Sequence, residues 1–281
     1  METSYYLRLI LFFLLTGIVF LLFQWWSAYR KRRRLEEIAK IPFSESYRQL
    51  LLRIPHYRNL SAKDKERIER SILRFIHTKD FHGVKMEVTD EMKVVIAFYA
   101  CLLLLHIETE NCYDNLKMVI LYPSPVVIDS VRNNGGIFTK EDFVIDGQSA
   151  NDTVVLVWHD VKREAFHLRH DNVILHEFAH EIDFMDGEID GVPPLERSKY
   201  HEWTQVLFKD FKHLSDVVLK EREWGKYKLL GSYAATNEAE FFAVVTERFF
   251  ESPHSLKRHF PELYDELMSF YRIDPAKLVE R

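Results

Sequence analysis

Cysteine is scarce in this sequence. Only Cys101 and Cys112 occur among its 281 residues, which excludes a disulfide framework and favours a reducing compartment. Cys101 lies in an apolar run, where a thiol packs as a small hydrophobic group. The chain also lacks internal repeats and, beyond its N-terminal apolar stretch, low-complexity segments. Hydrophobic residues make up 47% and aromatic residues 14% of the chain, enough to form a core and to exclude general disorder.

A basic surface is missing from most of the chain. The net charge is −5, but residues 1–40 contribute +4 and the remaining residues therefore −9. Nucleic-acid-binding domains carry clustered Lys and Arg. An acidic globular part without a basic stripe therefore argues against nucleic acid as a partner.

The longest apolar stretch stands at the N-terminus. Residues Tyr5 to Trp26 are apolar except for Arg8, Thr16 and Gln24. As a helix, this segment is about 33 Å long and can cross a hydrocarbon core of about 30 Å. Tyr or Trp pairs stand at both of its ends, as is typical of membrane interfaces. We therefore predict one transmembrane helix.

A basic run, Arg30–Arg34, follows the apolar stretch. A cleaved signal peptide has its basic residues first and a small-residue cleavage site last, whereas here the order is reversed and no A-x-A pattern occurs. The sequence therefore predicts a retained single-pass anchor in residues 1–40, whose basic run contacts membrane lipid. By the positive-inside rule, the N-terminus lies outside and the acidic domain, residues 41–281, lies in the cytoplasm. Ile41-Pro42 marks the start of that domain.

Beyond the anchor, the sequence predicts an α+β domain that is rich in helix and contains a small β-sheet. Ser61 is expected to cap a helix. Val94–His106 is apolar but too short to span a bilayer, so we expect a central buried helix there. Two runs rich in β-branched residues, Met118–Ile128 and Val154–Val161, are predicted strands with a turn at residues 133–136 between them. Further helices are predicted at about 171–185, 196–212, 237–251 and 261–271.

The segment from His176 to His180 reads His-Glu-Phe-Ala-His, the HExxH pattern of zinc enzymes. The pattern alone is only moderately specific, but its context strengthens it. Asp171-Asn172 can cap a helix here and Gly187 can end it. On such a helix the two imidazoles stand one turn apart and can reach the same ion at about 2.0–2.1 Å.

Two acidic residues of this helix have predicted roles. Glu177 points beside the ion, where a base that acts on a metal-activated water must stand. Asp183 follows His180 on the same stripe of the helix and is expected to orient an imidazole. A lone histidine would be better interpreted as an ordinary packed residue, but the aligned set favours a metal site.

A catalytic zinc ion needs one further protein ligand. The loop Asp186–Asp190 offers carboxylates, but neighbouring glycines make it mobile and exposed. The helix after Thr236, its predicted N-cap, is better placed. Glu240 and Glu247 both border the core side of that helix, where an unpaired carboxylate is costly. Periodicity ranks Glu240 above Glu247 but does not decide between them.

Several longer segments are more specific than HExxH. They are Leu175–His180 with Ile182-Asp183, Asp190–Leu195, Tyr233–Thr236, Ala239–Val244, Ala100–Leu104 and Pro261–Tyr264. Together they resemble the Mlc titration factor A family of zinc peptidases, and the resemblance covers most of residues 41–275.

The resemblance implies a zincin-type metallopeptidase fold and one bound Zn²⁺ ion. It implies that His176, His180 and Glu240 are the zinc ligands and that Glu177 is the catalytic base. It also assigns Tyr233 to the active site, a residue that the pattern alone could equally make a structural tyrosine before a helix. The predicted membrane span departs from the soluble, cytoplasmic members of the family.

The expected function is hydrolysis of a peptide or protein substrate by a metal-activated water, with Glu177 as general base. An alternative is a membrane-tethered protein that sequesters a transcriptional regulator, with hydrolysis secondary, because the family's namesake binds a transcriptional repressor. A purely structural zinc site is a third interpretation. It requires a fourth protein ligand, for which His159, in a predicted strand, His167 and His170 are the candidates.

Overall fold

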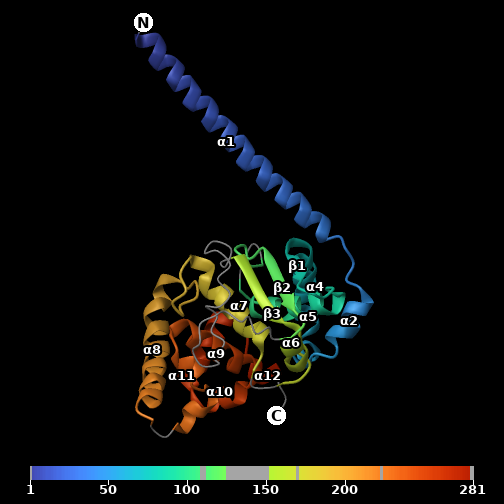
Figure 1. The fold of residues 1–281 in the computed structure, drawn as a ribbon, viewed down its shortest axis with the longest axis vertical. Helices are drawn as coiled ribbons and strands as arrows, with labels where there is room; N and C mark the ends of the chain where they lie inside the picture. Colours follow the sequence, from blue (N-terminus) through green and yellow to red (C-terminus); the bar gives the residue numbers. More distant parts are fainter. Residues whose placement is uncertain (1, 108–111, 125–151, 169–170, 222–223, 279–281) are drawn as a thin grey trace. The chain divides into compact units, whose positions relative to one another are not determined.

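The computed structural model describes residues 2–107, 112–124, 152–168, 171–221 and 224–278. The chain divides into two compact units, Met1–Pro42 and Phe43–Arg281, which are drawn in Figure 1. The first unit contains one long helix. The second unit contains the sheet and the remaining helices.

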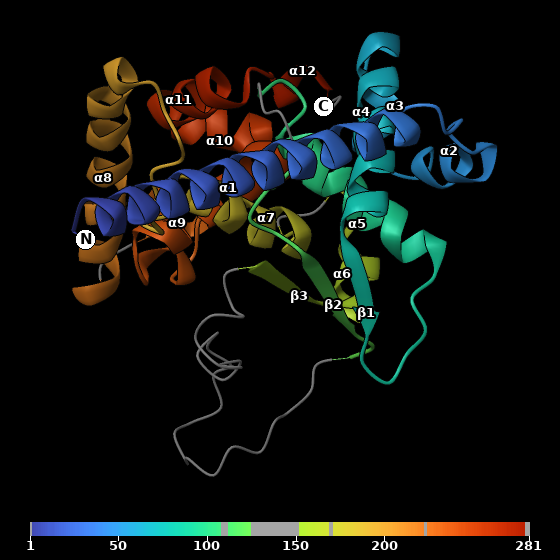
Figure 2. The ribbon, with the colours of Figure 1, turned by 90° about the horizontal axis from the view of Figure 1, so that it is seen from above.

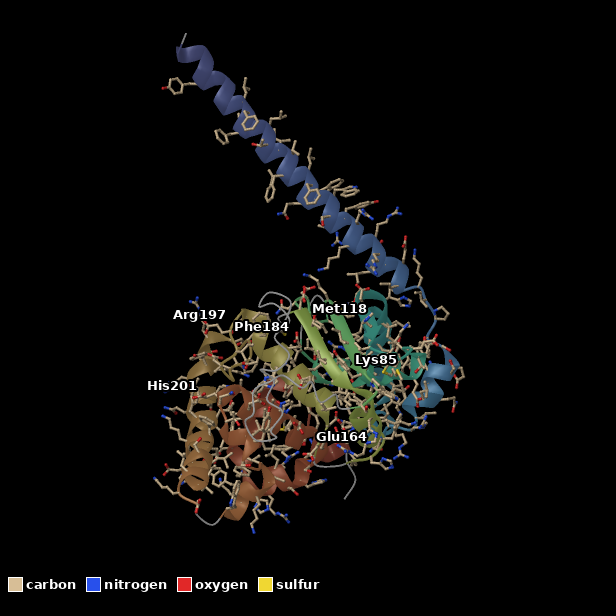
Figure 3. All side chains as sticks on the ribbon, in the orientation of Figure 1. Lys85, Met118, Glu164, Phe184, Arg197 and His201 are labelled. Atoms are coloured by element: carbon tan, nitrogen blue, oxygen red, sulfur yellow. The ribbon has the colours of Figure 1, made fainter. Side chains whose placement is uncertain are left out.

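The N-terminal unit is the helix α1, Glu2–Ile38. Its part from Leu11 onwards contains a window with a mean hydropathy of 1.9, whose side chains are not buried, as the sticks in Figure 3 illustrate. The guanidinium of Arg30 lies 4.8 Å from the ring centroid of Trp26. Basic and aromatic side chains therefore meet at the C-terminal end of the apolar stretch. By length and composition, α1 is apolar enough to cross a membrane.

The second unit is rich in helix. Its α-helices are α2 (Glu45–Leu51), α3 (Pro55–Asn59), α4 (Ala62–Thr78), α5 (Asp90–Leu103), α6 (Trp158–Glu164), α7 (Val173–Asp183), α8 (Arg197–Leu219), α9 (Glu238–Glu251), α10 (Pro253–His259), α11 (Pro261–Tyr271) and α12 (Pro275–Leu278). Short 3₁₀ turns are η3 (Phe184–Asp186), η4 (Gly225–Leu229) and η5 (Tyr233–Ala235).

The sheet is small and parallel. Its strands β1 (Asp80–Gly83), β2 (Met118–Tyr122) and β3 (Thr153–Val157) lie side by side in that order, as Figure 2 shows. In register, Met118 stands opposite Asp80 on one side and Thr153 on the other. The predicted α+β class, with many helices around a small sheet, is confirmed.

The strand predictions were correct only in part. β3 begins near the predicted position, but it ends at Val157, and Trp158 opens α6. The prediction of strand through Val161 was wrong, because Val161 and Ala165 are both buried at the four-residue spacing of a helix. β2 begins at Met118 as predicted and ends at Tyr122. Residues 125–128 and the predicted turn at 133–136 lie outside the described residues.

Helix α5 forms the centre of the core, as predicted for the run after Val94. Every residue from Val94 to Leu103 is buried, and the helix packs against α4 and α7. Cys101 is buried there as expected. The predicted cap at Ser61 is also confirmed, because its hydroxyl oxygen accepts the Asp64 N–H. β1 was not predicted, since its four residues contain no β-branched side chain.

Aromatic rings hold the buried face of α7. The ring of Phe178 lies 5.0 Å from that of Tyr113 and 5.7 Å from that of Phe75, measured between centroids in edge-to-face arrangements. Such pairs add to the burial free energy of large apolar rings. This packing fixes how α7 presents its opposite, polar face.

The loop after α7 passes closely between helices at Gly191. Its N–H donates to Asp183 Oδ2 at 2.9 Å, and its carbonyl accepts the indole N–H of Trp203 at 3.3 Å. Gly191 has a φ of 79°, and a Cβ atom there would lie 2.5 Å from the carbonyl oxygen of Glu238. The loop, which leads from α7 to α8, can therefore pass this close to the start of α9 only with glycine at this position.

We expect Gly191→Ala to lower the free energy of unfolding by about 2–4 kcal/mol, because strain at positive φ adds to a backbone clash. Gly187→Ala is the matched control. Gly187 also has a positive φ of 99°, but a Cβ atom at this position would have no other atom within 4 Å, so we expect a loss of only about 1 kcal/mol. Urea unfolding of the full chain in detergent measures both values. Equal losses would contradict the proposed close approach.

Candidate metal centre

Helix α7 carries the HExxH segment and begins as predicted, but it ends at Asp183, and the 3₁₀ turn η3 continues the chain to Gly187. The N–H of Leu175 donates to Asn172 Oδ1 at 3.2 Å, so Asn172 caps the helix. Gly187 adopts the left-handed conformation after the last turn, which suits glycine. His176 and His180 therefore stand one helical turn apart on a short, rigid helix.

Helix α9 faces α7 and begins one residue later than predicted. Asn237, not Thr236, is the N-cap, because its Oδ1 accepts the Glu240 N–H at 2.8 Å. Thr236 has helical backbone angles, which are unlike those of a cap, and its hydroxyl donates to the Tyr233 carbonyl. This start places Glu240 in the first turn of α9, where it is buried.

Three of the predicted site residues converge. His176 Nε2 lies 3.0 Å from Glu240 Oε2 and 3.3 Å from His180 Nε2, and His180 Nε2 lies 3.4 Å from Glu240 Oε2. Ligands at about 2.0–2.1 Å from a tetrahedral ion stand roughly 3.3–3.4 Å from one another. The two nitrogens and the oxygen therefore have the spacing of a metal triad. Two imidazoles and one carboxylate are also a donor set that suits zinc.

The electrostatics of this triad favour a cation. Burial by itself would lower the pKa of His176, but hydrogen bonds to Glu240 and Glu247 raise it to about 9. Burial would raise the pKa of Glu240, yet the two histidines hold it well below its usual range. Both shifts have the same cause: the carboxylates stabilise positive charge on the imidazole side of the site. A bound metal ion meets the same demand.

Glu177 and Tyr233 lie beside the triad. Glu177 is half-buried, and its charge acts on both His176 and Tyr233. The ring of Tyr233, from η5, is centred 5.8 Å from that of His176. Its side chain is 51% exposed, and partial burial together with the Glu240 carboxylate raises the pKa of the phenol. The structure therefore brings all five predicted site residues to one location.

Comparison with known proteins shows the family of this chain. A sequence model of the glucose-regulated metallo-peptidase family M90 matches residues 26–272. The chain belongs to the M90 family. As a member of a metallopeptidase family, it is expected to use a metal, and the triad offers the ligands for one.

Several relatives cover most of this M90 chain. It is 34% identical over 230 residues to an uncharacterized protein of Synechocystis sp., an alignment that covers 79% of this chain and 82% of the relative. It is 30% identical over 234 residues to Mlc titration factor A of Serratia proteamaculans, with 82% and 88% of the two chains covered. Mlc titration factor A of Klebsiella pneumoniae is 29% identical over 241 residues, with 84% and 88% covered. The resemblance drawn from the sequence motifs is thereby confirmed.

In this M90 chain Glu240 and Glu247 contact different nitrogens of one imidazole. Glu247 Oε1 lies 2.5 Å from His176 Nδ1, on the side of the ring away from the triad. The Nδ1–H donates to this carboxylate, which leaves the Nε2 lone pair for the triad. By periodicity alone, the two residues are rival candidates for the third ligand. Their seven-residue spacing, two helical turns, instead indicates two carboxylates that face the same histidine.

The role predicted for Asp183 was wrong. Its carboxylate does not orient an imidazole but accepts the Gly191 N–H, and Glu247 makes the contact to His176. Asp183 lies three residues beyond His180, where the end of α7 meets the loop. It is fully buried, and burial, with added repulsion from Asp190 and Asp186, raises its pKa to about 7. Asp183 therefore fixes the loop rather than the metal centre.

The remaining candidate ligands lie elsewhere. His159, on α6, and His167 do not join the triad, which is the one group with metal-ligand spacing among the residues that the structure describes. His170 lies outside the described residues. Among the described residues, no further His, Cys, Asp or Glu side chain therefore joins the triad as a fourth ligand.

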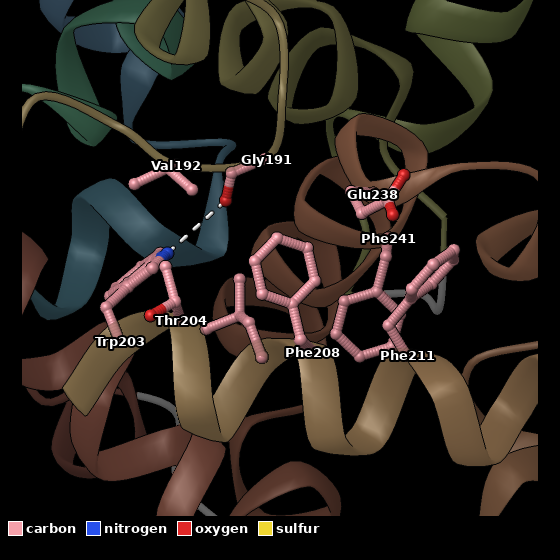
Figure 4. A pocket seen from close by; sticks show the side chains of 9 residues that line it. Gly191, Val192, Trp203, Thr204, Phe208, Phe211, Glu238 and Phe241 are labelled. Atoms are coloured by element: carbon pink, nitrogen blue, oxygen red, sulfur yellow. Dashed lines mark hydrogen bonds between the residues drawn. The ribbon is translucent and has the colours of Figure 1, made fainter. Parts of the chain in front are cut away.

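A small apolar hollow lies on another side of α9. Its walls are Gly191, Val192, Trp203, Thr204, Leu207, Phe208, Phe211, Glu238 and Phe241, drawn in Figure 4. Glu238 and Glu240 are two positions apart, which separates their side chains by about 200° around the helix. The hollow and the triad therefore occupy different faces of the first turn of α9.

Proposed function

We propose that this M90 protein is a zinc-dependent peptidase. In this proposal His176, His180 and Glu240 bind one Zn²⁺ ion, Glu177 is the general base and Tyr233 assists the reaction. The observation that carries the proposal is the triangle of 3.0, 3.3 and 3.4 Å between the three ligand atoms. A peptide or protein is the substrate class that membership of the family supports.

The chemistry follows from the positions of the side chains. Zinc at this site would lower the pKa of its water towards about 7 and polarise the scissile carbonyl. Glu177 takes the proton of the attacking water and passes it to the leaving amine. Glu240 and Glu247 keep the imidazole of His176 between two carboxylates, which holds its Nε2 toward the ion.

Tyr233 has the position and the protonation state of an electrophilic partner. Its raised pKa keeps the phenol protonated at neutral pH, so its O–H can donate to the oxyanion that develops on the carbonyl. Half of the Tyr233 surface is exposed beside His176, so a substrate can approach this side chain.

Glu177→Gln separates metal binding from catalysis. We expect the variant to bind one equivalent of zinc like the wild type, while peptide cleavage falls by about 10²–10⁴-fold because the general base is lost. Metal analysis and cleavage of a quenched-fluorescence peptide library measure the two properties. Glu188→Gln, at an exposed position after α7, is the matched control and should retain activity. Full activity of metal-loaded Glu177→Gln protein would contradict the assignment.

Tyr233→Phe tests the oxyanion contact. Removal of one such donor is expected to lower kcat by about 10²–10³-fold with little change in KM, because the hydrogen bond strengthens only in the transition state. Tyr200→Phe is the control, since Tyr200 is also 51% exposed but lies on α8. Steady-state kinetics on a single peptide measure both. An unchanged kcat would leave Tyr233 a structural residue.

We also propose that α1 anchors the protein in a membrane, with the N-terminus outside and the catalytic domain in the cytoplasm. The support comes from the apolar window within Leu11–Ile38 and from the basic run Arg30–Arg34 that follows the apolar stretch, since Lys and Arg flank spans on the cytoplasmic side.

Cysteine labelling in whole cells tests this orientation. Both native cysteines are buried, so the one cysteine added in each of the variants Thr3→Cys and Lys212→Cys reports on its own side of the membrane. A membrane-impermeant maleimide is expected to label Thr3→Cys in intact cells and Lys212→Cys only after lysis. Labelling of Lys212→Cys in intact cells would reverse the proposed orientation.

The relatives named Mlc titration factor A suggest a second candidate function, the sequestration of a transcriptional regulator at the membrane. The Glu177→Gln variant distinguishes the two. A binding function would survive the loss of the base, whereas a purely proteolytic function would not.

A further inference from the structure

Asn172 makes more contacts than a helix cap needs. It is buried, with 1% of its surface exposed, and its Oδ1 caps α7 through the Leu175 N–H. Its own backbone N–H donates to Glu247 Oε2 at 3.2 Å, and its Nδ2 donates to Glu251 Oε1 at 2.8 Å. The residue therefore joins the first turn of α7 to two buried carboxylates of α9.

One of these carboxylates leads directly to the metal triad. Glu247 binds Asn172 through Oε2 and His176 through Oε1. Because a carboxylate is planar and rigid, fixing one oxygen also fixes the direction of the other. Arg248 adds a weaker constraint, with a guanidinium nitrogen 3.5 Å from Glu247 Oε2. The orientation of the His176 ring thus depends on the position of Asn172.

Hydrogen-bond donors stabilise this region because the carboxylates of Glu247 and Glu251 are buried. Glu247 and Glu251 are 6% and 5% exposed, and a buried carboxylate that lacks donors is costly. His56 lies 3.9 Å from Glu251, but burial lowers the pKa of His56 to about 4, so it carries no charge at neutral pH. The imidazole of His56 therefore offers Glu251 no charged donor, and the amide of Asn172 donates to this carboxylate.

We propose that Asn172 is a positioning residue for the metal centre. Its side chain binds Glu251 and so fixes the position of its backbone N–H, and this N–H holds Glu247 in the orientation that directs Nε2 of His176 at the ion. The inference rests on the proposed function, because it presupposes that the triad binds zinc. A residue that only caps α7 would have no effect on the metal once the helix is formed. The two roles therefore predict different results for one substitution.

Asn172→Asp is that substitution. Asp caps helices as well as Asn does, and its charge suits a helix N-terminus, so a capping role predicts an unchanged metal site. A positioning role predicts damage, because the new carboxylate faces Glu251 instead of donating to it and pushes the start of α7 away from α9. We expect the dissociation constant for zinc to rise about 10–100-fold, the usual effect of losing a contact behind a metal ligand.

The measurements are made on the full chain in detergent. Competition with a chelating dye gives the zinc dissociation constant, and the visible spectrum of the Co²⁺-loaded protein reports the ligand geometry. Ser61→Asp is the control, because Ser61 caps α4 at an exposed position on a helix that carries none of the proposed ligands. We expect its zinc affinity and cobalt spectrum to match those of the wild type.

Exchange of donor and acceptor provides a rescue. In the double variant Asn172→Asp with Glu251→Gln, the amide stands on α9 and the carboxylate on α7, so the hydrogen bond can form again with the same net charge. If Asn172→Asp binds zinc about 100-fold more weakly than the wild type, we expect the double variant to bind it about tenfold more tightly than Asn172→Asp does. If Asn172→Asp folds poorly, Asn172→Ser keeps a capping oxygen and removes the Nδ2 donor without adding charge. Asn172→Ser is then expected to weaken zinc binding while the helix cap is kept.

Three outcomes decide the matter. Wild-type affinity in both Asn172→Asp and Asn172→Ser would overturn the positioning role and leave Asn172 a cap. A double variant as weak as Asn172→Asp would show that the contact to Glu251 does not act on the metal, and would overturn it equally. Absence of zinc binding by the wild type itself would instead refute the proposed function, which distinguishes that failure from the other two.

Discussion

The imidazole of His176 lies between two carboxylates of one helix, and the arrangement of the site depends on this contact. Glu240 approaches Nε2 and Glu247 approaches Nδ1. The two residues stand two turns apart on α9, so a single helix supplies both sides of the ring. This arrangement stabilises positive charge at the ring and at the atoms around it, which is the condition that a metal cation satisfies.

The contact to His176 lies in the core, so α9 is buried. The buried polar side chains of α9 therefore need hydrogen-bond partners. All of its residues from Ala239 to Glu251 are buried, including Glu240, Glu247, Arg248 and Glu251. Charged groups are expensive in a core unless they are paired. The partners come from α7 and from the residues just before it. The polar face of α7 and the ionisable residues of α9 therefore stabilise each other, and neither helix could shift without leaving the other unsatisfied.

Packing behind the site limits such a shift. The rings of Phe75, Tyr113 and Phe178 hold the apolar face of α7. At the end of the helix, Asp183 and Gly191 join α7 to the loop, and Gly191 passes close to the backbone of α9 at Glu238. The positions of His176 and Glu240 are thus fixed from the core side and from the loop side. This rigidity suits a triad whose atoms must stand within tenths of an ångström of metal spacing.

The sequence by itself determined the features that depend on local chemistry. The cap at Asn172, the left-handed turn at Gly187, the spacing of His176 and His180 and the buried run after Val94 all follow from propensity and period. Periodicity alone could not separate Glu240 from Glu247, because both lie on one face of α9 and only the distances between two helices show which nitrogen of His176 each one meets. Nor could it place Asp183, whose partner is a loop glycine. Those decisions belong to the tertiary structure. The roles of Glu240 and Glu247 depend on contacts between helices about 65–80 residues apart in the chain, and the role of Asp183 depends on how the loop after α7 folds back to it.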